Sequence, residues 1–254
     1  MPMLTQEQVS TFNEQGYLVL PAVADAEAVA ALREVTFDHL ESQQEPIELE
    51  SEVNYPGSPK SVDDAGGRTA RRLLMAYERD PVFKAWAHHQ EITECIRQLL
   101  GSERLMLTPN HHNTVMTKHP KYSSDTLWHR DTRYWHYSDN RLVNAWTALG
   151  AEHQLNGGMK IIPGSHLWHV DAEGLDDLQF LKLDYEGNQM QLAKAIYVNL
   201  SPGDVILFSP YVFHAADRCK TNDIKCSLVF TYFGEGTVPV NNTKSSRFPD
   251  IQIL

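Results

Sequence analysis

The chain has 254 residues, of which 42% are hydrophobic and 22% charged, a composition typical of a folded globular protein with a sizeable core. All-β sandwiches and barrels of this length often form one unit, so we expect a single domain over residues 1–254. The formal net charge of −11 argues against nucleic-acid or membrane partners, because both would require a surplus of Lys and Arg.

A helix, a short strand and a second helix are predicted at the beginning of the chain. Thr5 and Gln8 match a capping box, and the helix that they open should end near Gly16. An apolar strand over residues 17–20 follows, and Asp25 precedes a second amphipathic helix. No catalytic group is recognised in this opening.

Residues 41–69 are rich in acidic residues, Pro, Gly and Ser and show neither helical nor strand periodicity. We interpret them as a long irregular loop that serves as a lid over the site, because loops of this length are often lids or binding loops. Beyond them, Arg71, Arg72 and Lys84 flank a helix-like run, and their charges are expected on a solvated helix face. A further amphipathic helix is predicted over residues 90–100.

Residues 1–104 are therefore expected to form a helix-rich part, after which short apolar segments separated by turns begin. Such spacing favours an antiparallel sandwich or barrel over residues 105–236, with a tail at 237–254. Helical propensity around residues 175–182 predicts an excursion from the sheets. The predicted strands cover residues 106–118, 127–131, 143–149, 159–162, 195–200, 204–209 and 227–233. The fold class is mainly β with flanking helices (α+β).

The three cysteines, Cys95, Cys219 and Cys226, form neither an even set nor a CxxC pair. They predict a reducing compartment without a disulfide framework. The polar first residues do not resemble a signal peptide, and no apolar stretch approaches the roughly 18 residues of a membrane span. We expect a cytoplasmic protein, and the sequence leaves open whether it is a monomer or a homo-oligomer.

A candidate metal site is centred on His129 and Asp131. On a strand, side chains two residues apart point to the same face, so both could contact one cation. His214, about 80 residues later and just beyond an apolar strand, would complete two histidines and one carboxylate, the facial set of non-haem Fe(II). The adjacent His111 and His112 would face opposite sides of a strand and are not expected to be ligands.

Four stretches in order resemble the phytanoyl-CoA dioxygenase family of Fe(II)/2-oxoglutarate-dependent oxygenases. They are the opening LTQEQVSTFNEQGYLVLPAVADAEAVAAL, the tetrapeptide WHRD at 128–131, NAWTAL followed by NGGMKIIPGSH within 144–166, and SPGDVILF at 201–208. The resemblance implies a double-stranded β-helix, or jelly-roll, core with helices packed on one side. His129, Asp131 and His214 become the iron ligands, with Pro163-Gly164-Ser165-His166 as a structural turn.

The same resemblance implies 2-oxoglutarate as cosubstrate and O2 as oxidant. A C–H bond of a small molecule would be oxidised, by hydroxylation in the expected case, with release of succinate and CO2. The candidate cosubstrate residues are Trp146, Thr114 and Met116, together with Lys225, which occupies the position of the family's anchoring Arg 11 residues after the distal histidine. Lysine supplies charge without the two-pronged guanidinium, so Arg218 is kept as an alternative anchor.

Ala216 replaces a small hydroxyl residue of the family pattern, which removes another cosubstrate contact. Candidate substrate residues follow the metal pair and mix aromatic with basic side chains: Arg133, Tyr134, Trp135 and His136. They suit a polar or anionic small molecule, although an exposed strand end with a packed tryptophan explains them equally well. The acyl-CoA substrate in the family's name is not inherited, because fold does not fix substrate. The alternative function is a jelly-roll metal protein that does not use 2-oxoglutarate, or a non-catalytic binding module.

Overall fold

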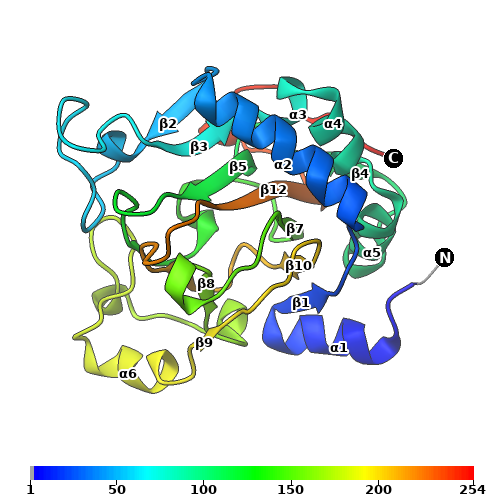
Figure 1. Ribbon diagram of the computed structural model, residues 1–254. Helices are drawn as coiled ribbons and strands as arrows, with labels where there is room; N and C mark the ends of the chain where they lie inside the picture. Colours follow the sequence, from blue (N-terminus) through cyan, green and yellow to red (C-terminus); the bar gives the residue numbers. More distant parts are fainter. Residues whose placement is uncertain (1–2) are drawn as a thin grey trace.

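The computed structural model describes residues 3–254, which fold around two antiparallel β-sheets stacked on one another (Figure 1). The larger sheet has the strand order β1 (Tyr17–Leu20), β10 (Val205–Phe208), β7 (Leu142–Ala148), β12 (Lys225–Gly234), β5 (Asn113–Lys118), β3 (Ala70–Leu74), β2 (Ile47–Leu49), with β4 (Leu105–Leu107) joining β12 to β13 (Ile251–Gln252). The smaller sheet has the order β6 (Thr126–His129), β11 (His214–Ala216), β8 (Met159–Ile161), β9 (Ile196–Tyr197).

Helices cover the outer face of the larger sheet, and α2 runs across it in Figure 1. Their apolar side chains form one core with that face of the sheet, in which Leu32 of α2 and Ile96 of α5 are buried. These helices are α1 (Gln6–Gln15), α2 (Ala26–Glu41), α3 (Ala76–Arg79), α4 (Pro81–Ala87) and α5 (Gln90–Leu100), whereas α6 (Glu186–Leu192) lies apart from them, next to β9 in Figure 1.

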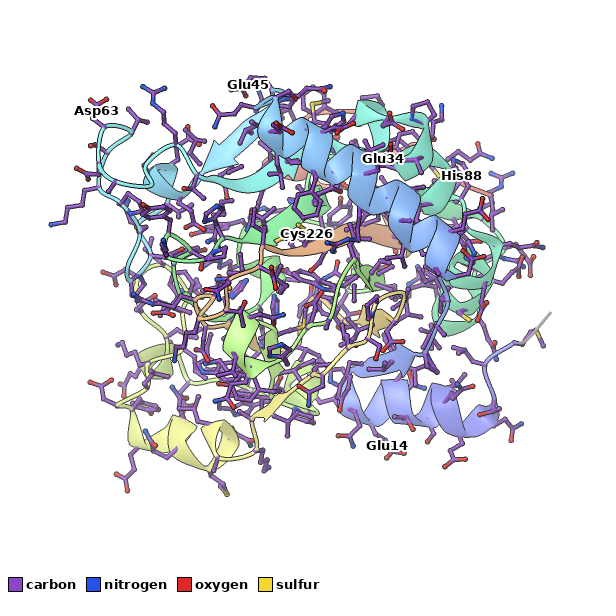
Figure 2. All side chains as sticks on the ribbon, in the orientation of Figure 1. Glu14, Glu34, Glu45, Asp63, His88 and Cys226 are labelled. Atoms are coloured by element: carbon purple, nitrogen blue, oxygen red, sulfur yellow. The ribbon has the colours of Figure 1, made fainter. Side chains whose placement is uncertain are left out.

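The predicted helix ends are confirmed at α1 and α5. Thr5 and Gln8 form the capping box of α1. Gly16 ends that helix at a φ of 78°, a left-handed conformation that glycine adopts without steric cost, and Gly101 does the same for α5. Acidic side chains of α1 and α2, labelled Glu14 and Glu34 in Figure 2, project outwards.

Alternation along the central strands decides which side chains enter the space between the sheets. On β7, Val143 and Ala145 pack under the helices, whereas Trp146 belongs to the core between the sheets. On β12, Leu228 likewise faces the helices and Val229 faces inwards. Residues two positions from these share their direction, so the inner faces of β7, β12 and β5 present the side chains on which the site is built.

Several expected elements differ in the structure. Arg71 and Arg72 lie in strand β3, and the Arg71 side chain is buried rather than solvated. The predicted strand over 106–118 is interrupted: β4 and β5 are separated by a turn over residues 108–112. In each case backbone pairing across the sheet decided the outcome, which local periodicity does not report.

The helical excursion is also displaced, because residues 175–182 form an irregular stretch with a bridge between Leu175 and Leu181, and α6 begins only at Glu186. Residues 41–69 are less irregular than expected, since they contain β2 and a 3₁₀ turn at Glu50–Glu52. Within residues 3–254, the helices are too short or too polar to cross a membrane.

Candidate metal centre and adjoining cavities

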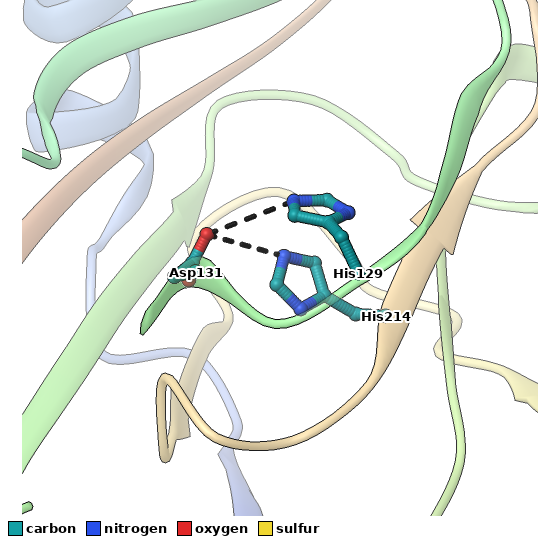
Figure 3. Close-up of side chains that lie close together, drawn as sticks. All are labelled: His129, Asp131 and His214. Carbon is teal, nitrogen blue, oxygen red and sulfur yellow. Dashed lines mark ion pairs between the residues drawn. The ribbon is translucent and has the colours of Figure 1, made fainter. Parts of the chain in front are cut away.

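His129, Asp131 and His214 meet at the edge of the smaller sheet (Figure 3). His129 ends β6 and His214 begins β11, and the two are directly paired in the antiparallel register. Asp131 Oδ1 lies 3.7 Å from His129 Nε2 and 3.6 Å from His214 Nε2. One ligand atom from each of the three falls within 4.8 Å of the others, so together they could hold one metal ion.

The spacing predicted that Asp131 shares a strand with His129, but in the structure it does not. The strand ends at His129, and Asp131 opens a 3₁₀ turn, Asp131–Tyr134. Its backbone N–H donates to the carbonyl of Pro210 over 3.0 Å, which ties this turn to the loop before His214. The carboxylate therefore approaches the imidazoles from a turn rather than from a pleated strand.

Backbone carbonyls fix the tautomer of both histidines. Nδ1 of His129 lies 2.8 Å from the Leu127 carbonyl, and Nδ1 of His214 lies 3.0 Å from the Val212 carbonyl. A carbonyl only accepts, so each Nδ1 carries the proton and each Nε2 presents a lone pair towards Asp131. This is the hydrogen-bonding pattern by which proteins orient histidine ligands to a metal.

The three side chains are at most 9% exposed. Burial lowers the pKa of His129 and of His214, which keeps the imidazoles neutral. Burial alone would raise the pKa of Asp131, but the neighbouring imidazoles of His112 and His214 outweigh it and hold that pKa well below its usual range. Two neutral imidazoles and one carboxylate are the donor set of non-haem Fe(II), so the residues fit that ion.

A pair of inward-facing side chains holds the carboxylate. Asn144 of β7 donates from Nδ2 to Asp131 Oδ2 over 2.8 Å, and Thr231 of β12 donates to Asn144 Oδ1 over 2.5 Å. Oδ2 is thereby engaged, which leaves Oδ1 directed at the two imidazoles. Asn144 lies in the predicted NAWTAL motif, but its contact with Asp131 was not anticipated.

His112 lies beside the carboxylate of Asp131, a contact that the sequence did not predict. It lies in the turn before β5, where alternation does not apply, and its Nε2 is 2.9 Å from Asp131 Oδ1. Its ring stands edge-on to Trp135, at 5.3 Å between centroids. It does not belong to the group of three that could hold the metal.

Two cavities adjoin the metal centre. The first, the inner cavity, lies between the sheets and has only about 40 Å³ of free space. It is lined by Arg71, Arg72, His112, Met116, Thr117, Lys118, Thr126, His129, Trp146, Gly157, Met159, His214, Ala215, Ala216 and Lys225. Basic side chains therefore surround the space behind the two imidazoles.

The second, the outer cavity, opens beside Asp131 and has about 240 Å³. It is lined by Glu48, Val53, Tyr55, Arg72, His111, His112, His129, Asp131, Arg133, Tyr134, Trp135 and Lys244. Residues 41–69 thus contribute three side chains to its wall. A wider groove of about 580 Å³ between α2 and residues 62–70 contains none of the three candidate ligands.

Comparison with known proteins identifies the family. The model of the family described as Phytanoyl-CoA dioxygenase (PhyH) matches residues 12–227. The chain belongs to the PhyH family. The PhyH match contains all three candidate ligands, His129, Asp131 and His214, and every strand of the smaller sheet.

Among curated PhyH-like relatives, the ectoine dioxygenase of Halomonas elongata is 26% identical over 176 residues, covering 67% of this chain and 48% of that protein. The chain spans about half the length of the first such relatives. The solved carbocyclase SnoK from nogalamycin biosynthesis has a TM-score of 0.73 at 19% identity, covering 99% and 97% of the two chains. EctD from S. alaskensis, solved with 2-oxoglutarate and 5-hydroxyectoine, has a TM-score of 0.70 at 20% identity, covering 91% and 76%. These likenesses confirm the jelly-roll fold of this PhyH member.

Three of the four predicted cosubstrate residues of this PhyH chain line the inner cavity. Met116, Trp146 and Lys225 line the inner cavity, whereas Thr114 is on the same face of β5 but does not reach it. Arg218 is outside, where it forms an ion pair of 2.6 Å with Asp125 at the surface. The roles of these residues remain predictions.

The predicted substrate residues gather at the outer cavity, with one exception. Arg133, Tyr134 and Trp135 line it, and His136 is exposed beside it. Arg133 donates to the hydroxyl of Tyr55 over 3.0 Å and stacks on Phe180 with its guanidinium 4.0 Å from the ring centroid. Tyr55 comes from residues 41–69, the segment interpreted from its sequence as a lid over the site.

Proposed function

We propose that this PhyH-family chain is a non-haem Fe(II)- and 2-oxoglutarate-dependent dioxygenase that hydroxylates a C–H bond of a small molecule. One atom of O2 enters the product hydroxyl and the other enters succinate, while the carboxyl carbon of the 2-oxo acid leaves as CO2. The observation that carries the proposal is the meeting of His129, Asp131 and His214 between two separate cavities. Three protein ligands leave coordination positions for other molecules, and Fe(II) in such a site supplies activation of O2.

The inner cavity is the proposed site of the 2-oxo acid. It lies behind the two imidazoles and is lined by Lys118, Lys225, Arg71 and Arg72, which suit a dianion. Its free space of about 40 Å³ holds very few waters. Flexible side chains such as Met116 and the lysines must therefore shift when a five-carbon acid enters.

The outer cavity is the proposed substrate site. Arg133 and Lys244 line it without an ion pair to a carboxylate among residues 3–254, whereas Glu48 is shared between Arg71 and Arg72. This excess of positive charge favours a small molecule with an anionic group. Tyr55 places part of the 41–69 segment against Arg133, which supports the proposal that this segment acts as a lid.

A cytoplasmic location belongs to the same proposal. It is supported by the three cysteines, which are buried and unpaired in the structure, as thiols are in a reducing compartment.

Anaerobic addition of Fe(II) and 2-oxoglutarate tests the reaction class. We expect a weak metal-to-ligand charge-transfer band in the visible, lost in His129→Ala and kept in His166→Ala, whose imidazole contacts the Asn13 carbonyl away from the metal centre. Aerobic incubation should then form succinate in step with substrate oxidation. Bound iron without the band would refute the 2-oxoglutarate part of the proposal.

A metal protein that does not use 2-oxoglutarate is the second candidate. It is favoured by Lys225, whose ammonium is already bonded to Glu152, and by Ala216, which offers no hydroxyl to the inner cavity. Under this alternative iron binds normally, and no succinate forms with any candidate substrate.

A further inference from the structure

Two lysines face each other across neighbouring strands in the inner cavity. Lys118 on β5 and Lys225 on β12 are direct partners in the antiparallel register, so their side chains lie on the same face. Both residues are buried, at 6% and 5% exposure. They differ in what their ammonium groups contact, and this difference assigns them different roles.

Lys225 has a carboxylate of its own. Its Nζ lies 2.9 Å from Glu152 Oε2 and 2.9 Å from Ser227 Oγ. Oε1 of the fully buried Glu152 accepts from Ser227 over 2.6 Å and from the Trp146 indole over 3.0 Å. The charge of Lys225 is therefore compensated inside the protein, and two of its three hydrogen-bond donors are in use.

Lys118 has no carboxylate within ion-pair distance among residues 3–254. Its Nζ donates to the Ser124 carbonyl over 2.5 Å and to Thr126 Oγ1 over 3.2 Å, both neutral acceptors. The nearby carboxylate of Glu50 accepts from Ser124 and lies 3.5 Å from the Arg71 guanidinium. A buried charge is costly unless it is paired, so the cavity around Lys118 is built for an anion that the chain itself does not provide.

We propose that Lys118, rather than Lys225, supplies the positive charge that receives the far carboxylate of the 2-oxo acid. The inference rests on the proposed function and departs from the family pattern, which places that charge at position 225. Lys118 lines the same cavity as His129 and His214. Lys225 is a positioning residue that holds Glu152, and through it Trp146, against the cavity.

The acid-base state of Lys118 agrees with this role. Burial, and next the charge of Arg71, lowers the pKa of Lys118 to about 7. An anion bound beside the ammonium would favour its charged form and raise the pKa of Lys118 back towards its usual value. Its flexible four-carbon stem also lets the group move as the narrow cavity fills.

Binding titrations of the anaerobic Fe(II) protein distinguish the two lysines. The charge-transfer band reports both 2-oxoglutarate and 2-oxopentanoate, which has the same 2-oxo acid group but not the far carboxylate, so each acid is titrated separately. We expect Lys118→Met to weaken 2-oxoglutarate binding about 10- to 100-fold, the range for a lost charged hydrogen bond. Binding of 2-oxopentanoate should remain within about threefold of the wild type, because that ligand does not use the lysine charge.

The matched control replaces the other lysine without leaving a buried carboxylate unpaired. In Lys225→Met/Glu152→Gln the amide oxygen still accepts from Trp146 and Ser227. Because Lys225 also lines the inner cavity, we expect 2-oxoglutarate affinity to fall, but by only about threefold, far less than in Lys118→Met. Lys118→Met should also unfold at a higher denaturant concentration than the wild type at pH 6.5, since an unpaired buried charge is removed.

Wild-type affinity in Lys118→Met, or loss of binding confined to the double variant, would overturn the assignment to Lys118. Failure of the wild type to bind either acid with iron in place would instead refute the proposed function. Binding of the two acids by the wild-type protein therefore distinguishes the two failures.

Discussion

Asn144 and Asp131 are joined by a hydrogen bond of 2.8 Å from the Asn144 amide to Oδ2, the carboxylate oxygen turned away from the imidazoles. Thr231 in turn fixes the amide. Removal of this support in Asn144→Ala should lower the affinity for Fe(II), or for Mn²⁺ as a stable substitute, about 10- to 100-fold. Metal titration followed by paramagnetic resonance or calorimetry measures the change.

Asn110 provides the control for that experiment. It is also buried, but its amide bonds the carbonyls of Ser245 and Phe248 at the C-terminal segment. Asn110→Ala should lose stability without losing metal affinity. Equal metal binding by the Asn144 variant and the wild type would show that Asp131 needs no second partner.

The buried ion pair between Lys225 and Glu152 should contribute strongly to the free energy of unfolding. Their side chains are 3% and 0% exposed, so Lys225→Met leaves an uncompensated carboxylate in the interior. We expect the free energy of unfolding to fall by about 3–5 kcal/mol, and by less in Lys225→Met/Glu152→Gln, where no charge remains. Denaturant unfolding of both variants measures the difference. A single variant as stable as the wild type would mean that Glu152 is not charged in the folded chain.

Binding of 2-oxoglutarate should weaken as the pH rises above neutrality. With the pKa of Lys118 near 7 in the free protein and higher in the complex, the complex holds one more proton than its components between those two values. Affinity is then full below about pH 7 and falls by up to tenfold per pH unit above it. The groups whose charges act on Lys118 are Arg71, Glu50, Lys225 and Asp125.

Titrations between pH 6.5 and 9 under anaerobic conditions follow this dependence, with buffer ionic strength held constant. The Lys118→Met variant supplies the comparison, because its weaker binding should be flat over the same range. A wild-type profile as flat as that of the variant would exclude a titrating Lys118 from the binding step.

Gly157 should be intolerant of a side chain. Its φ is 80°, and an added Cβ would lie 2.6 Å from the Asp217 carbonyl oxygen and 3.1 Å from Cγ of Lys118. Gly157→Ala should therefore destabilise the protein by about 2–4 kcal/mol and weaken 2-oxoglutarate binding. Gly101→Ala isolates the backbone part, since Gly101 has a φ of 59° and open space around it, and should cost only about 1–2 kcal/mol. Similar losses in both variants would show that the contacts with Asp217 and Lys118 are relieved without cost.

The sequence predicted the metal group better than its surroundings. His129, Asp131 and His214 stand in motifs whose order is local and readable. The start of α1 follows from side chain–backbone bonds between Thr5 and Gln8, and the end of α5 follows from the left-handed backbone of Gly101. The contacts around the ligands depend on strand pairing instead.

The register of the paired strands explains which contacts around the metal group could not be predicted. Lys118 lies opposite Lys225 because of the pairing between β5 and β12, and no spacing in the sequence reports which residues of these strands face each other. Glu152 reaches Lys225 from 73 positions away. Arg71 was expected on a solvated helix face because it flanks a helix-like run, although its strand lies against β5 with the side chain covered.

Arg72 contributes to the walls of both the inner and the outer cavity, as do His112 and His129. Two anionic ligands in those cavities would share one guanidinium and lie within a single electrostatic field of low screening. Each would thus reduce the attraction left for the other. Under the proposed function, 2-oxoglutarate and its product succinate are both dianions, so an anionic substrate in the outer cavity is held less firmly while either acid occupies the inner cavity. The outer cavity regains its full attraction only when succinate leaves.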